Sequence, residues 1–370
     1  MKKLSAVFII IFLITNISCV SVSAQEQTFD YSGVYNSLSD EAAGYLQSLG
    51  VSAADPRALS NLSFEGVMAQ LSQMAGQSMD APLRGLVSVV AVLILCSMLT
   101  AYKSSLSNDV GETVQTAAAL CISLAVAAPA VSFIQSAGGV IANCANLFLA
   151  YIPVVSVMMA TSGRAISALT YQGSMIAAGQ GVARVSSDVI LPFLNLFLGV
   201  SITSGVAPQV RLGGLCALTA RFTKWLLAFV MSIFTAVLSV RQVASNALDT
   251  VASRTAKFAL SSFVPVVGGA LSEAYRTVQG SLHVLKSGLG IFVILALAVT
   301  FLPIVLQGLG WALCLMAGKT LAEVMGLEGC AALLEALRMV FSTLIAVLLC
   351  VMAVFIISTA VAFTIGGDGA

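Results

Sequence analysis

The run from Thr113 to Gly163 contains no charged residue over 51 positions. A membrane-spanning helix needs about 20 predominantly apolar residues, so this run predicts two spans joined by a tight turn near Gly138 and Gly139. A soluble domain carries about 25% charged residues, whereas this chain of 370 residues carries 9% and is 59% hydrophobic. The sequence therefore predicts an all-α, polytopic membrane protein. Its net charge of +1 argues against nucleic acid as a partner.

Other uncharged runs predict the remaining spans, for a total of about seven transmembrane helices. The run at 287–318 is too long for one span and short for two, and we count it as one. The other runs are 85–102, 189–210, 225–240 and 339–367.

The first 24 residues have the features of a secretory signal peptide. Lys2 and Lys3 precede an apolar stretch, and small residues lead to a predicted cleavage between Ala24 and Gln25. An uncleaved first span is the alternative. Cleavage would place the mature N-terminus outside the cytoplasm.

Residues 25–82 are polar and mildly acidic, and they predict a short helical extracytoplasmic segment. One helix is expected within 37–50, with Ser39 as its N-cap and Gly50 as its stop. A second, amphipathic helix is expected within 56–79. The segment is either a docking surface or a lead-in to the first span.

Lys and Arg in the loops orient the spans, because cytoplasmic loops carry an excess of both. With the N-terminus outside, loops 103–112, 161–188 and 241–286 would face the cytoplasm, as would the C-terminus. Lys319 and Arg338 would then lie on the outer side. This topology requires that residues 258–272 do not cross the membrane.

Three landmarks recur at nearly constant spacing and predict an internal repeat of roughly 110 residues. Pro153 and Pro265 lie 112 residues apart, Pro192 and Pro303 lie 111 apart, and TAVLSV at 235–240 matches IAVLLCV at 345–351. The expected organisation is two leading transmembrane helices at 83–138, repeat 1 at 139–250, repeat 2 at 251–362 and a tail at 363–370. Duplicated membrane units of this kind are common in transporters.

The sequence FVPVVGG at 263–269 is the candidate for a re-entrant segment that lines a path through the membrane. Proline removes a backbone donor and glycine permits bending or close helix packing. A kinked helix packed against its neighbours is the alternative. The residues concerned are Phe263, Pro265, Val266, Val267, Gly268 and Gly269, with Pro153, Val154 and Val155 as their counterparts in repeat 1.

Polar side chains within the spans are amides rather than carboxylates, which argues against a proton-relay transporter. They either bond helices together or line a substrate site. His283 is the single histidine and the cysteines have no metal-ligand spacing. We therefore expect no enzyme, no cofactor and no metal site. The amides are Asn143, Asn146, Asn195 and Gln307.

The signal sequence, the short polar segment, the polytopic body and FVPVVGGALSEAYRTVQGSLHVLKSGLGIF at 263–292 together resemble the stage III sporulation protein AE family of endospore-forming bacteria. The resemblance covers nearly the whole mature chain. It implies a multi-pass protein of the mother-cell membrane that surrounds the forespore. It offers no catalytic residues.

The resemblance also implies partners. These are other subunits of a secretion-like channel complex, including a cytosolic ATPase and ring-forming membrane proteins, and indirectly a forespore membrane protein. The implied role is a membrane component of this channel, required for forespore development and late sigma-factor activity. A stand-alone secondary transporter and a non-conducting scaffold are the alternatives.

Overall fold

The computed structural model describes residues 32–48, 64–101, 108–161, 165–206 and 268–364, together with most positions from 214 to 236. Regular structure within these residues is helical, with no strand, which confirms the predicted all-α class. The elements are α2 (Ser32–Tyr35), α3 (Asp40–Ser48), α4 (Phe64–Ala101), α5 (Asn108–Thr161), α6 (Ala165–Val185), the π-helix η3 (Ser186–Ile190), α7 (Leu191–Val206), α9 (Gly268–Val324) and α10 (Glu328–Thr364).

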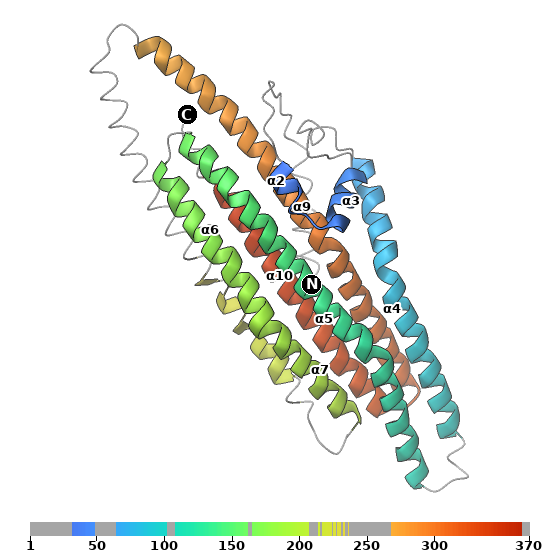
Figure 1. Cartoon of the computed structure of the whole chain (residues 1–370). Helices are drawn as coiled ribbons and strands as arrows, with labels where there is room; N and C mark the ends of the chain where they lie inside the picture. The colour runs from blue at the N-terminus through green and yellow to red at the C-terminus, as the bar shows by residue number, and fades with distance from the viewer. Residues whose placement is uncertain are drawn as a thin grey trace.

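Long helices run side by side along one axis (Figure 1). α4 and α9 lie on one side of the bundle, α6 and α7 on the other, and α5 and α10 between them. α10 is central, because it packs against α9, α7, α5 and α6. Five of the described helical segments are long and apolar enough to cross a membrane: Ser72–Leu99, Thr116–Ala160, Ala165–Thr203, Leu289–Val324 and Glu328–Ala360.

α5 is one unbroken helix of 54 residues, so the predicted turn near Gly138 and Gly139 is wrong. A Cβ on Gly138 would lie 2.7 Å from Cδ1 of Leu191, so this glycine permits close packing against α7. A continuous helix also keeps its backbone hydrogen bonds satisfied, which a turn in an apolar environment would not.

The continuity of α5 changes the predicted topology. The two ends of α5, Asn108 and Thr161, lie at opposite ends of the bundle. If α5 crosses the membrane once, the predicted loops 103–112 and 161–188 cannot both face the cytoplasm. The α9–α10 turn lies at the same end of the bundle as the start of α5, although the sequence placed Lys319 and Arg338 on the opposite side from 103–112. The excess of Lys and Arg on the cytoplasmic side was counted for the predicted loops. That count does not apply to this arrangement of the helices.

A π-helical segment joins α6 to α7 without a break in the helical path. Pro192, the second residue of α7, follows it after Leu191 and has no N–H to donate to the preceding turn. The wider π turn accommodates that missing donor. The part of the predicted loop 161–188 that lies within α6 and η3 is thus helical and packs along α5.

The predicted helix near residue 40 is confirmed as α3, and the backbone N–H of Ala42 donates to the Ser39 hydroxyl at 3.4 Å. The amphipathic helix predicted within 56–79 is not separate from the first span. Its part from Phe64 on is the beginning of α4, whose interior includes Pro82, and 56–63 lie outside the described residues.

A stack of three buried aromatic rings forms the centre of the bundle. Phe133 of α5 and Trp311 of α9 lie on either side of Phe341 of α10, each with ring centroids 5.4 Å from it. Glycines let the helices approach at this level: a Cβ on Gly85 would lie 2.3 Å from the Trp311 ring, and one on Gly308 would lie 2.7 Å from Phe133.

Several sequence predictions lie outside the described residues. These are the signal peptide with its cleavage between Ala24 and Gln25, the Gly50 stop, and the segment Phe263, Pro265, Val266 and Val267. Gly268 and Gly269 form the start of α9. The proposed boundary between residues 138 and 139 falls inside α5, and the internal repeat stays a prediction.

Candidate functional site at the α9–α10 turn

A tight turn joins α9 to α10. α9 ends at Val324, and Gly326 has a φ of +73°, a conformation that favours glycine. The Leu327 N–H donates to the Ala322 carbonyl at 2.9 Å, and the Gly326 N–H donates to the Glu323 carbonyl at 3.1 Å. This left-handed C-cap reverses the chain so that α9 and α10 pack antiparallel.

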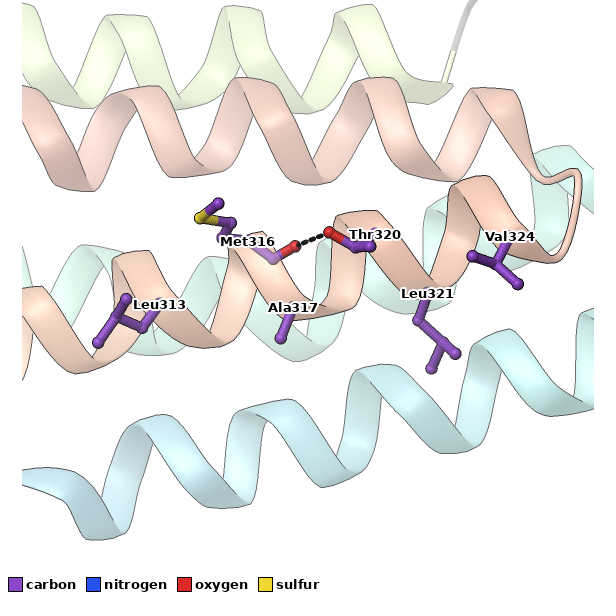
Figure 2. A pocket seen from close by; sticks show the side chains of 6 residues that line it. All are labelled: Leu313, Met316, Ala317, Thr320, Leu321 and Val324. Carbon is purple, nitrogen blue, oxygen red and sulfur yellow. Dashed lines mark hydrogen bonds between the residues drawn. The ribbon is translucent and has the colours of Figure 1, made fainter.

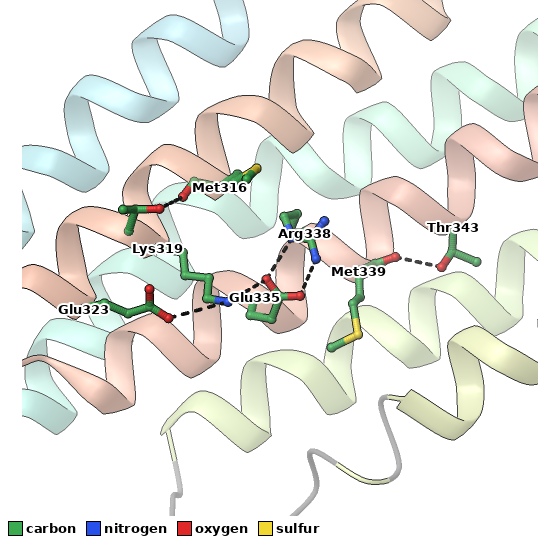
Figure 3. Close-up of polar contacts among 8 residues, drawn as sticks. Met316, Lys319, Glu323, Glu335, Arg338, Met339 and Thr343 are labelled. Carbon is green, nitrogen blue, oxygen red and sulfur yellow. Dashed lines mark hydrogen bonds and ion pairs between the residues drawn. The ribbon is translucent and has the colours of Figure 1, made fainter. Parts of the chain in front are cut away.

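Four charged side chains next to this turn form what we call the α9–α10 charge cluster (Figure 3). Lys319 of α9 lies 3.5 Å from Glu323 of the same helix and 3.4 Å from Glu335 of α10. Two of the guanidinium nitrogens of Arg338, Nε and Nη2, donate to the Glu335 carboxylate, the first at 2.8 Å. The members are Lys319, Glu323, Glu335 and Arg338.

Glu335 is the shared member, since it accepts from Arg338 and pairs with Lys319 across the helix boundary. Its side chain is 27% exposed, and those of Lys319 and Arg338 are similarly half-buried. Two cations and two carboxylates give the cluster no net charge. The arrangement therefore clamps α9 to α10 and leaves little charge available for an external ion.

A shallow groove of about 530 Å³ lies beside the cluster on α9 (Figure 2). Thr320 contributes its one hydroxyl, which donates to the Met316 carbonyl of its own helix at 3.0 Å. The surface is otherwise apolar, so it suits an apolar ligand or helix rather than a polar solute. The lining residues are Leu313, Met316, Ala317, Thr320, Leu321 and Val324.

The amides predicted from the sequence do not gather in this groove. Asn143 and Asn146 are exposed on α5, Asn195 is exposed on α7, and Gln307 is half-buried on α9. The repeat counterpart Pro153 is exposed on α5, next to half-buried Val154 and buried Val155. Within the described residues no group of three His, Cys, Asp or Glu side chains could hold a metal ion.

Sequence reasoning missed a second polar feature, the α5–α6 polar seam formed by Tyr151, Ser156, Tyr171 and Gln172. The Ser156 hydroxyl lies 3.2 Å from the Ala168 carbonyl and 3.3 Å from Oε1 of Gln172. Tyr151 and Tyr171 are almost fully buried. The signal was present in YIPVVS and TYQGS, but treating 161–188 as a loop hid the fact that the two segments face each other.

The fold and the composition define the class of this molecule: it is a polytopic helical membrane protein. The family model for stage III sporulation protein AE matches residues 57–366, and the chain belongs to that family.

A relative from Bacillus subtilis (strain 168), the stage III sporulation protein AE of that organism, is 29% identical over 146 residues. The aligned region covers 40% of this chain and 37% of the relative, a little over a third of each. No solved structure matches the chain.

Proposed function

We propose that the protein is a membrane component of the channel complex between mother cell and forespore, required for forespore development and late sigma-factor activity. The observation that carries this proposal is the family match over residues 57–366, which ties an all-helical membrane chain to stage III of sporulation. We place the protein in the mother-cell membrane around the forespore. Its proposed partners are a cytosolic ATPase and ring-forming membrane subunits.

Two features of the structure support a subunit rather than an isolated transporter. The exposed amides Asn143, Asn146 and Asn195 do not line the groove on α9. That groove is open and apolar, as expected of a surface that meets another apolar partner. Neither feature supplies a polar pocket at the interface of two repeats, which the transporter alternative needs.

The testing experiment is deletion of the gene in its native host, with a membrane dye and a late forespore reporter followed through sporulation. We expect engulfment to be completed, after which the forespore shrinks and the late reporter stays silent. Expression of the intact gene from a second locus, as the control, should restore both. Normal spore formation in the deletion strain would overturn the proposal.

Complementation with the double variant Asn146→Leu and Gln307→Leu separates the scaffold alternative from a conduit or a transporter. A conduit or transporter that uses these amides loses reporter activity even though the protein is present in the membrane. A non-conducting scaffold keeps full activity, because the change adds apolar surface without altering a charged contact. Membrane abundance measured by immunoblot is the control for folding.

A further inference from the structure

Exposed aromatic side chains follow one another on the segment that comes after α7, which is helical at its described positions between 217 and 236. The Phe222 ring lies 6.1 Å from that of Phe193 on α7 and 6.1 Å from that of Trp225. The Trp225 and Phe229 rings stack at 5.5 Å with an interplanar angle of 10°. Phe222, Trp225 and Phe229 are each about half exposed, and we call these three residues the aromatic ladder.

The opposite face of this segment packs inside the bundle. Ala220 and Thr223 are buried, and Leu226 and Val230 line a narrow cavity together with residues of α6, η3 and α10. The aromatic ladder therefore faces outward. Arg221, which precedes the ladder directly, is exposed as well.

The aromatic ladder lies level with the middle of α5. Phe193, whose ring meets that of Phe222, is two residues from Leu191 on α7. Leu191 packs on Gly138, and Gly138 is the midpoint of the apolar part of α5, Thr116–Ala160. If α5 were centred in the bilayer, the ladder would lie at the centre of the hydrocarbon core.

Exposed charges at the same height argue against that position. Arg221 adjoins the ladder, and Asp188 of η3 lies three residues before Leu191. Arg184 is the midpoint of the apolar path Ala165–Thr203, which runs through α6, η3 and α7. All three charged side chains are exposed. Charged side chains are strongly disfavoured at the centre of a bilayer, and the short side chain of Asp188 cannot reach the headgroups from there.

We propose that the aromatic ladder and Arg221 bind phospholipid at one surface of the membrane, halfway along α5. The Trp225 indole lies among the glycerol and ester groups, where its N–H finds acceptors, and Arg221 contacts a lipid phosphate. One half of the bundle lies in hydrocarbon and the other half stands outside it. This proposal does not depend on the proposed role in sporulation, because it concerns how the chain sits in its membrane.

Depth-dependent fluorescence quenching tests the position of the ladder, because the chain has two tryptophans, of which Trp225 is exposed and Trp311 is buried. The full chain is reconstituted in vesicles of phosphatidylcholine and phosphatidylglycerol that are brominated either next to the headgroup or at the end of the acyl chain. Bromine next to the headgroup should quench Trp225 about twofold more strongly than bromine at the chain end, because interfacial tryptophans lie at headgroup level.

The variant Trp225→Phe is the control for this measurement. It leaves Trp311 as the emitter and should lose most of the quenching. Equal or stronger quenching from the chain end would place the ladder in the hydrocarbon core, and no quenching from either lipid would mean that the ladder faces water or protein. Either result would overturn the proposal.

Thiol accessibility gives an independent test along α6, η3 and α7. Single cysteines replace Ala177, Ser187 or Leu196, which are all exposed, in a background with the native cysteines changed to alanine. In permeabilised vesicles a water-soluble maleimide should label Ser187→Cys about tenfold faster than one of the two flanking cysteines, because a thiol in hydrocarbon does not ionise. The other flanking cysteine should react as fast as Ser187→Cys.

Labelling after unfolding in detergent is the control that each of the three thiols is reactive. Protection of Ser187→Cys would contradict the proposal. Equal reaction of all three cysteines, or protection of both flanking ones, would contradict it too, because no membrane surface would then separate Ala177 from Leu196.

Discussion

Glu335 accepts hydrogen bonds from Arg338 and pairs with Lys319 at 3.4 Å, so one carboxylate contacts a cation on each of two helices. The variant Glu335→Gln keeps the shape of the side chain but removes its charge. We expect it to lower the free energy of unfolding by about 1–2 kcal/mol, more than a surface pair and less than a fully buried one. Chemical unfolding in detergent micelles measures the change.

Glu323→Gln is the matched control for this prediction. Among the described residues Glu323 pairs with Lys319 of the same helix, and its side chain is 54% exposed. Solvent screens such a pair, so we expect little change in stability. Equal effects of the two variants would mean that Glu335 does not clamp α9 to α10.

At the scale of the helix, α4 and α9 are held together by a close contact at one glycine. A Cβ on Gly85 would lie 2.3 Å from Cη2 and 2.5 Å from Cζ3 of Trp311, and that ring is fixed in the aromatic stack. We expect Gly85→Ala to lower the free energy of unfolding by about 1–3 kcal/mol through overpacking. Thermal unfolding followed by tryptophan fluorescence reports the loss.

Gly76→Ala in the same helix should have the opposite sign. Apart from its own stretch of helix, no atom of the described residues lies within 4 Å of a Cβ built on Gly76. Alanine therefore adds no clash there and should gain about 0.5–1 kcal/mol from helix propensity. If both alanine variants were stabilising, α4 would not pack on α9 through a close contact at Gly85.

Sequence reasoning succeeded where neighbouring residues decide the structure, and it failed where a distant residue decides. The α3 helix was predictable because Ser39 caps it locally. The long helices were predictable because the number of consecutive apolar residues, which can be read directly from the sequence, shows whether a segment can span a bilayer. Gly138 was misinterpreted because a glycine in an apolar run permits either a turn or a close helix contact. Only the position of Leu191, 53 residues away in the sequence, decides between them.

The site shows the same limit. Lys319 and Arg338 were recognised from the sequence as loop charges that orient the spans. Their pairing through Glu335 depends on the reversal of the chain at Gly326, which brings positions 16 residues apart on different helices into contact. The α5–α6 polar seam likewise required knowing that α6 is a helix along α5.

At the scale of the whole molecule, the apolar helices are longer than a bilayer requires. The apolar part of α5 covers 45 residues, about 68 Å at 1.5 Å per residue, against a hydrocarbon core of about 30 Å. Even a strongly tilted helix of this length extends beyond the core. The bundle therefore extends past the membrane at one end or both, where protein partners can reach it.

The continuity of α5 fixes which connections share a side of the membrane, and this can be tested in cells. Single cysteines at Ser105, at Glu328 and at Ala165, in a background with the native cysteines replaced by alanine, mark three connections. A membrane-impermeant maleimide should distinguish Ala165→Cys from the other two, because α5 separates 102–107 from 162–164 and α9–α10 returns to the first side.

Labelling after permeabilisation is the control that each cysteine is reactive, and it also reveals positions protected by a partner. If Ser105→Cys and Ala165→Cys were labelled from the same side, residues 113–163 would cross the membrane twice and α5 would be a hairpin. If they are labelled from opposite sides, α5 crosses once. Every charge in the α9–α10 cluster then lies toward the side that carries the α4–α5 connection.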